Sequence, residues 1–178
     1  MAEFFLELFS EEIPAGLQKN LRNKLLEEFQ KLFLEKSIKS KKSFSLSTPN
    51  RLIIVFDGLD KQVNILSQEV KGPNTKAPEQ ALEGFIKSNI IEKKDLFKKK
   101  TEKGEFYFFK TKSKSLKTQD LLTEFVPKLL ERYQWKKSMK WGNFDLHWGR
   151  PLKSILSVFD KKILNFELHH IASSNFTY

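Results

Sequence analysis

The spacing of apolar residues along the first sixty positions predicts a strand, a helix and a hairpin, in that order. Residues 3–9 alternate in polarity as a half-buried strand does. Apolar residues at three- and four-residue spacing then predict an amphipathic helix over residues 15–36. Two strands, 44–47 and 51–57, flank the turn sequence TPN at 48–50, which predicts a hairpin or a tight corner.

The middle of the chain has weaker patterns and more lysine. We expect a short strand within 62–70, a loop at 71–74 and a short helix over 78–88. Residues 90–103 are rich in lysine and are expected to hold one helical turn, and the aromatic run at 105–111 reads as a strand.

The last third predicts one more helix and a second strand pair. A helix is expected over 118–133, with Thr118 as its N-cap and Pro127 kinking or dividing it. Strands are expected at 153–159 and 162–168, on either side of an Asp-Lys turn.

Strand pairs of the hairpin type recur throughout this pattern, although helices interleave with them. We therefore expect an α+β fold of mainly antiparallel sheets with packed amphipathic helices, not a doubly wound parallel sheet. The charged connection at 112–117 suggests two small subdomains, 1–115 and 116–178.

The most distinctive stretch is 139–153, which reads MKWGNFDLHWGRPLK. It contains Trp141 and Trp148, each followed by glycine, and the basic residues Lys140, Arg150 and Lys153. Interleaved aromatic and basic residues favour a recognition surface over a plain core strand. The proline that follows Arg150 excludes a central strand at that point. For either tryptophan alone, packing in the core is the alternative.

Composition allows one ordinary domain or two small ones in 178 residues. With 39% apolar residues and 17 phenylalanines, the chain can bury a core. No apolar run reaches the length of about 20 residues that spans a bilayer, and the first residues lack the basic region of a secretory signal. Cysteine is absent, which excludes disulfides and thiolate sites. We therefore expect a cytoplasmic protein with no membrane partner.

The net charge of +10 is localised. Residues 93–117 hold ten lysines against three acids, and residues 134–153 hold five basic residues against one acid. Localised positive charge suits a polyanion such as nucleic acid. A solvated lysine face is the alternative, above all for 93–117. Arginine is rare here, and Arg51 and Arg150 both lie beside turn signals, where a buried ion pair or a carbonyl contact is the alternative to anion binding.

A search for catalytic chemistry finds no complete constellation. There is no phosphate-binding glycine motif, no GxSxG elbow and no HExxH. The paired acids Glu11 and Glu12 are better explained by a helix start, and adjacent His169 and His170 would point to opposite sides of a strand. The strand EFYFFK invites comparison with base-stacking RNA-recognition strands, but it lacks their glycines, so a core strand is favoured.

Five segments in order carry a resemblance to one family. They are LELFSEEIP (6–14), STPNRLIIVFDGL (47–59), EVKGPN (69–74), EKGEFYFF (102–109) and MKWGNFDLHWGRPLKSIL (139–156). Together they resemble the N-terminal region of the β subunit of bacterial heterotetrameric glycyl-tRNA synthetase. The chain departs from that family at its last residues, SSNFTY, where the family is usually basic. We therefore expect this chain to be part of a longer β subunit.

The resemblance implies an enzyme that joins glycine to tRNA with ATP and Mg²⁺ as an α2β2 assembly. The α subunit would carry the active site, so no catalytic residue, metal or cofactor is expected in this region. The β subunit would bind tRNA and support assembly. Candidate RNA contacts are Lys140, Arg150 and Lys153 with phosphates, Trp141 or Trp148 by stacking or by shaping the surface, and Arg51 as a further candidate.

Two other functions remain open at this point. One is a free-standing RNA-binding module. The other is a structural or interaction domain that holds the synthetase together through its basic face without touching RNA.

Overall fold

The computed structural model describes residues 1–65, 69–101, 104–111 and 114–177 and contains two compact units. The first unit combines residues 1–63 with residues 116–178, and the inserted unit comprises residues 64–115. This division differs from the expected split into 1–115 and 116–178, although one of its boundaries falls at 115/116. The reason is long-range strand pairing, because strands from both ends of the chain share one sheet.

The sheet of the first unit is built around its first strand, β1 (Ala2–Ser10). β1 pairs antiparallel with β3 (Arg51–Leu59) on one side and with β9 (Leu152–Phe159) on the other. β2 (Lys42–Thr48) extends the β3 side. On the β9 side, the short strands β10 (Lys162–Ile163), β11 (Glu167–Leu168) and β12 (Ile171–Ser174) follow, and only the pairing of β12 with β9 is parallel among those recorded. The expected α+β fold with mainly antiparallel sheet is confirmed.

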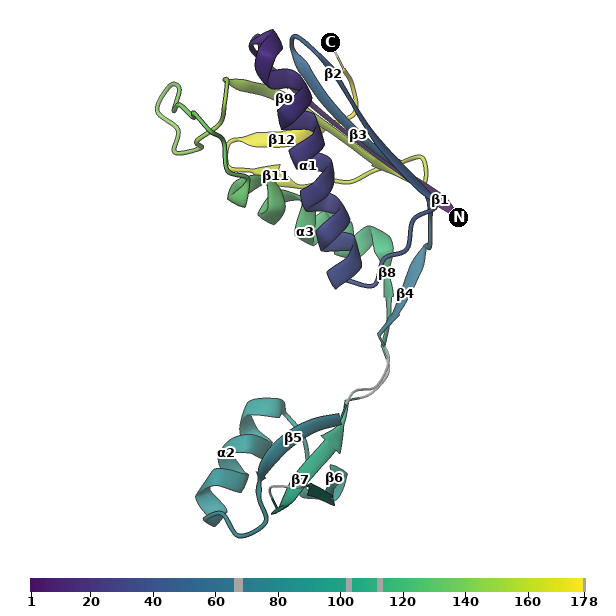
Figure 1. The fold of residues 1–178 in the computed structure, drawn as a ribbon, viewed down its shortest axis with the longest axis vertical. Coiled ribbons are helices and arrows are strands. Elements are labelled where there is room, and N and C mark those ends of the chain that lie inside the picture. The colour runs from purple at the N-terminus through teal and green to yellow at the C-terminus, as the bar shows by residue number, and fades with distance from the viewer. Residues whose placement is uncertain (66–68, 102–103, 112–113, 178) are drawn as a thin grey trace. The chain divides into compact units, whose positions relative to one another are not determined.

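One face of this sheet carries the core of the first unit. Alternate residues of β1, namely Phe4, Leu6 and Leu8, are almost fully buried on that face. The helices α1 (Ala15–Glu35) and α3 (Thr118–Arg132) pack against it in one continuous apolar cluster (Figure 1). The strand and the two helices are therefore amphipathic for the same reason, which is burial of one face of each.

The expected hairpin at 48–50 is confirmed and also anchors the start of α1. Pro49 and Asn50 form the two-residue turn between β2 and β3. Their carbonyls accept hydrogen bonds from the backbone of Ile13 and Ser10, at 2.6 and 2.8 Å. The turn thus fixes the chain between β1 and the first helix.

The inserted unit is a three-stranded antiparallel sheet with one helix. Its strands are β5 (Glu69–Asn74), β7 (Gly104–Lys110) and β6 (Leu96–Thr101), in that order across the sheet. The helix α2 (Glu79–Asn89) and a single 3-10 turn, η1 (Lys93–Asp95), lie between β5 and β6 in the sequence. β4 (Gln62–Ile65) pairs with β8 (Lys114–Lys117) where the chain passes from one unit to the other.

One expectation for the inserted unit was wrong, and one strand was not anticipated. Residues 71–74 belong to strand β5 rather than to a loop, because Lys71 pairs with Phe108 of β7. The helical turn expected within 90–103 is present as η1, and residues 96–101 after it form β6, a strand that the sequence pattern did not indicate and that pairs with residues 104–109 of β7. Residues 66–68 of the expected strand 62–70, and 112–113 of the expected connection, lie outside the described residues.

Three details of the last third also differ. Thr118 does not cap α3, because its hydroxyl donates to the carbonyl of Asp60 at 2.5 Å. Pro127 does not divide the helix, which continues to Arg132 and keeps the neighbouring Val126 buried in the core. The expected strand 162–168 is two short strands, and His169 and His170 lie in the turn after the second.

Trp148 is a core residue, which removes it from the candidates for stacking on RNA. Its side chain is 1% exposed, and its ring centroid lies 4.8 Å from that of Trp135 and 6.1 Å from that of Tyr133. Its backbone exchanges two hydrogen bonds with Met139. The core-packing alternative is therefore confirmed for Trp148.

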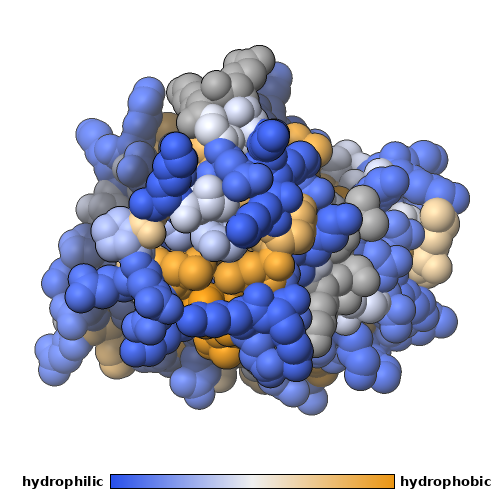
Figure 2. All heavy atoms as spheres, turned by 90° about the horizontal axis from the view of Figure 1, so that it is seen from below, coloured by the Kyte–Doolittle hydropathy of each residue, from blue (hydrophilic) through white to orange (hydrophobic). Residues whose placement is uncertain are grey.

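The face of the protein drawn in Figure 2 is mostly polar. Hydrophilic residues cover most of the face drawn in Figure 2, and apolar residues gather only in a limited area at its middle. Within the described ranges, no helix has the length and apolarity needed to cross a membrane.

Replacement of Trp148 by alanine should strongly destabilise the first unit. Loss of a buried aromatic ring costs about 3–5 kcal/mol in the free energy of unfolding. Urea denaturation of the 178-residue chain measures this loss. Leu34→Ala is the control, because Leu34 is 81% exposed and its truncation should change the free energy by less than about 0.5 kcal/mol. Equal effects of the two substitutions would contradict the buried position of Trp148.

Tyr133 should make the free energy of unfolding depend on pH in the alkaline range. Burial raises the pKa of its hydroxyl, which donates to the carbonyl of Leu21 at 3.0 Å. The contribution of this buried, protonated hydroxyl to the free energy of unfolding is complete below the ordinary tyrosine pKa of about 10. It is lost as the pH rises above that value, because only the unfolded chain then releases the proton readily. The free energy of unfolding should therefore fall more steeply above pH 10 in the unmodified chain than in Tyr133→Phe. Identical alkaline profiles would rule this account out.

Candidate nucleic-acid interface

A groove of about 580 Å³ lies on the first unit beside the start of α1. Its walls come from three segments far apart in sequence, namely the beginning of α1, the stretch that follows α3 and the turn before β9. The lining residues are Ile13, Pro14, Leu17, Asn20, Leu21, Lys24, Gln134, Trp135, Lys136, Lys137, Ser138, Met139, Gly149 and Arg150. We refer to it as the basic groove.

The charge of the basic groove has one sign. Four of its lining residues are cationic, and no carboxylate lines it among the described residues. Between these cations lie apolar side chains that remain partly open to solvent, with Leu17 38% and Met139 40% exposed. This combination suits an anion that also presents apolar surface.

The absence of a side chain at Gly149 allows the turn before β9 to approach the segment that follows α3. A Cβ atom on Gly149 would lie only 2.1 Å from a ring carbon of Trp135, so no other residue allows this ring to pack there. The next residue but one, Pro151, accepts a hydrogen bond from the backbone of Glu11 at 2.9 Å and precedes β9, as the sequence predicted. Arg150 is held between these two fixed points.

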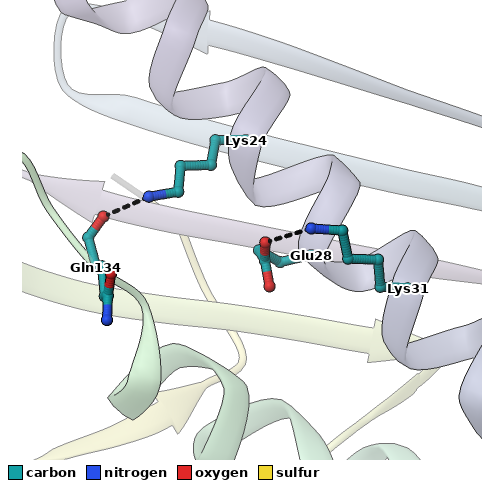
Figure 3. A network of polar contacts seen from close by, with 4 residues as sticks. All are labelled: Lys24, Glu28, Lys31 and Gln134. Atoms are coloured by element: carbon teal, nitrogen blue, oxygen red, sulfur yellow. Dashed lines mark hydrogen bonds and ion pairs between the residues drawn. The ribbon is translucent and has the colours of Figure 1, made fainter.

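Lys24 of α1 links the groove to the end of α3. Its ammonium donates to the carbonyl of Gln134 at 3.0 Å (Figure 3). The same ammonium lies 5.6 Å from the centre of the Tyr133 ring. It also borders a second hollow of about 540 Å³ between α1 and α3. That hollow includes the carboxylates of Glu28 and Glu35, and Glu28 pairs with Lys31 at 3.0 Å. Some of its cations are therefore neutralised, whereas Lys136, Lys137 and Arg150 of the basic groove have no carboxylate partner among the described residues.

Arg150 is the one sequence-predicted candidate that lies in the basic groove. Within the described part of the chain, its guanidinium has no hydrogen-bond or ion-pair partner. It also borders a smaller hollow that contains Glu11 and Glu12. Glu11 pairs with Lys153 at 2.7 Å, and among the described residues no ion pair joins Arg150 to Glu11 or Glu12.

Lys140 and Trp141 occupy a different surface. Lys140 pairs with Asp145 at 2.9 Å, and this hydrogen bond holds the pKa of Asp145 below its ordinary value. Trp141 is half-buried, and its ring centroid lies 5.6 Å from that of His170. His170 also stacks on the exposed ring of Phe144 at 3.5 Å, which the sequence did not indicate.

Arg51 and Lys153 meet on the outer side of the main sheet around Phe9. The Arg51 guanidinium lies 4.7 Å from the centre of the Phe9 ring and pairs with Glu7 at 3.5 Å. The Lys153 ammonium lies 6.0 Å from the same ring. Because Glu7 is buried, the ion-pair alternative for Arg51 is confirmed.

The structure therefore distributes the candidates over separate places instead of collecting them in one site. Sequence reasoning missed Lys24, Lys136, Lys137 and Trp135 as members of one groove. The excess of basic residues in 134–153 was a signal for two of them. No pattern along the chain indicated that they face the start of α1. Across the described residues, no cluster of three or more His, Cys, Asp or Glu side chains is placed to hold a metal ion.

Comparison with known proteins gives one consistent answer. The family described as "Glycyl-tRNA synthetase beta subunit" matches residues 4–178. The chain is 38% identical over all its 178 residues to the glycine–tRNA ligase beta subunits of Rickettsia bellii and Rickettsia prowazekii, and 36% identical to that of Rickettsia felis. It spans 27% of the length of each of these relatives. The chain belongs to the glycyl-tRNA synthetase beta subunit family and corresponds to its N-terminal region.

Proposed function

We propose that this region helps a glycine–tRNA ligase to charge tRNA with glycine by holding the tRNA through the basic groove. The relatives are beta subunits of glycine–tRNA ligase, whose name implies an alpha-subunit partner and tRNA as a substrate. The assembly would be α2β2 and would work in the cytoplasm. ATP and Mg²⁺ would bind at the α subunit, and this region would contribute no catalytic residue.

The observation that carries this proposal is the unopposed charge of the basic groove. Lys136, Lys137 and Arg150 lie along it with no lining carboxylate in the described residues. Phosphates neutralised by such cations release condensed counterions, which favours binding at low salt. The exposed apolar side chains between them can contact ribose and base surfaces. Contact with the tRNA backbone would position the substrate without reading its sequence.

The two other functions considered from the sequence have different support. A free-standing RNA-binding module is not favoured, because the whole chain matches one synthetase subunit family. A purely structural role would place an acidic protein surface in the basic groove. It predicts that tRNA affinity does not depend on the groove's charge.

Removal of three groove charges should weaken tRNA binding by the complete α2β2 enzyme. The variant Lys136→Gln, Lys137→Gln, Arg150→Gln should lower the slope of log Kd against log salt by roughly 2–3, because each phosphate contact contributes about 0.7–0.9. Filter binding or fluorescence anisotropy with glycine tRNA at several salt concentrations measures this slope. The rate of glycine activation without tRNA should stay unchanged.

The matched control removes three lysines of the same unit that lie outside the groove, as Lys39→Gln, Lys161→Gln, Lys162→Gln. All three side chains are exposed. The control should leave the slope nearly unchanged. If both triple variants reduce the slope equally, or if neither does, the groove is not a tRNA contact.

A further inference from the structure

We infer that one face of the three-stranded sheet in the inserted unit binds unpaired nucleotides, with bases stacking on phenylalanine rings and phosphates pairing with lysines. The inference rests on the proposed function only in taking tRNA as the RNA concerned. It adds a second site, of different chemistry, on a unit that the basic groove does not involve.

Strand register places the necessary side chains on one face. Phe97 and Lys99 of β6 pair with Phe108 and Phe106 of β7. Lys71 of β5 pairs with Phe108 along the other edge of β7. Directly paired residues project from the same face of an antiparallel sheet. The aromatic–lysine face therefore comprises Lys71 of β5, Phe97 and Lys99 of β6, and Phe106, Phe108 and Lys110 of β7.

The helix of this unit covers the opposite face. Phe85 of α2 lies 5.7 Å from Phe109, whose neighbour Phe108 points the other way. Gly72 also approaches the ring of Phe85, so that a Cβ there would lie 2.7 Å from it. Within the described residues of the inserted unit, no helix or further strand covers the aromatic–lysine face.

Rings and cations alternate closely on this face. The rings of Phe97 and Phe108 stack with centroids 6.1 Å apart and planes 27° apart. The ammonium of Lys71 lies 3.6 Å from the centre of the Phe106 ring, and that of Lys99 lies 5.7 Å from Phe108. Lys110 lies 5.9 Å from Phe97. Cations in this position are held by the ring faces and stay exposed to solvent.

The face keeps a positive charge after its internal ion pairs are counted. Glu69 approaches Lys99 at 2.6 Å and Lys110 at 4.0 Å, and the bond from Lys99 lowers the pKa of Glu69. Lys71 has no carboxylate partner in the described residues. One carboxylate thus opposes three lysines. Lys71 and Lys110 lie over the half-buried rings of Phe106 and Phe97, whereas Lys99 lies over Phe108, whose ring is buried.

This chemistry favours RNA over an acidic protein surface. An acidic peptide would need the lysines but not the rings, whereas a nucleotide offers a phosphate for the cation and a base for the ring. Phosphates would draw the ammonium groups away from the rings of Phe97 and Phe106 and leave these ring faces open for stacking. Paired bases are not available for such stacking, so the ligand is a loop or a single-stranded end.

Because successive lysines of β6 lie on opposite faces of the sheet, variants with and without the proposed contacts can be matched in charge. In the complete α2β2 enzyme, Lys71→Gln, Lys99→Gln, Lys110→Gln removes the charge of the aromatic–lysine face. The control Lys87→Gln, Lys98→Gln, Lys100→Gln removes the same charge from α2 and from the β6 positions that face the other way. We expect the first variant, and not the control, to lower the salt slope of tRNA binding by about 2, since each contact with single strands contributes about 0.7.

Stacking is tested separately by Phe106→Leu, which keeps an apolar side chain but removes the ring. It should weaken tRNA binding about tenfold, as expected for loss of one stacked base. Phe85→Leu, on the α2 side, should leave affinity unchanged once thermal melting shows that the variant is folded. Equal effects of the two substitutions would overturn the inference.

A photoreactive phenylalanine analogue at position 97 identifies the occupant even where a substitution disturbs folding. In the complete enzyme with glycine tRNA, we expect the adduct on the RNA at unpaired nucleotides. Adducts on protein alone, or no adduct, would overturn the inference. If the groove variant weakens binding while the variant of the aromatic–lysine face matches its control, only the inference fails and the proposed function stands.

Discussion

The pairing of β1 on both of its edges is the constraint on which the rest of the first unit depends. Its partners β3 and β9 are separated by about half of the chain, so the central sheet forms only when residues 51–59 and 152–159 reach the same strand. The inward residues of β1 then support both α1 and α3. Because α1 and the segment after α3 are positioned by that shared core, the basic groove is a consequence of this pairing.

Local chemistry was sufficient to predict much of the fold. The turn at Pro49 and Asn50, the helical spacing of α1 and the alternation of β1 each depend on neighbouring residues and were confirmed. The features that could not be predicted from the sequence depend on packing between residues far apart in the chain. Trp148 is buried against residues outside the run MKWGNFDLHWGRPLK, including Tyr133 and Trp135, and nothing in that run distinguishes this tryptophan from Trp141.

The same limit applies to the candidate site. Runs of lysine are visible in the sequence, but the face on which each lysine lies follows from strand register. Sequence analysis missed β6 because three consecutive lysines, Lys98 to Lys100, interrupt the apolar pattern that indicates a strand. The segment still forms a strand because it pairs with the aromatic strand β7. The positive charge is consequently divided between a groove with apolar walls on one unit and an aromatic sheet face on the other, which suit different parts of an RNA.

The most direct test of this account is cross-linking of the full-length enzyme, in the proposed assembly with its α subunit, to glycine tRNA, with the adducts on residues 1–178 mapped by mass spectrometry. The account predicts adducts at Lys136 or Lys137 in the basic groove and at β6 or β7 of the inserted unit. Adducts confined to the α subunit and to the rest of the β subunit would contradict it and would leave this region a structural support for the synthetase.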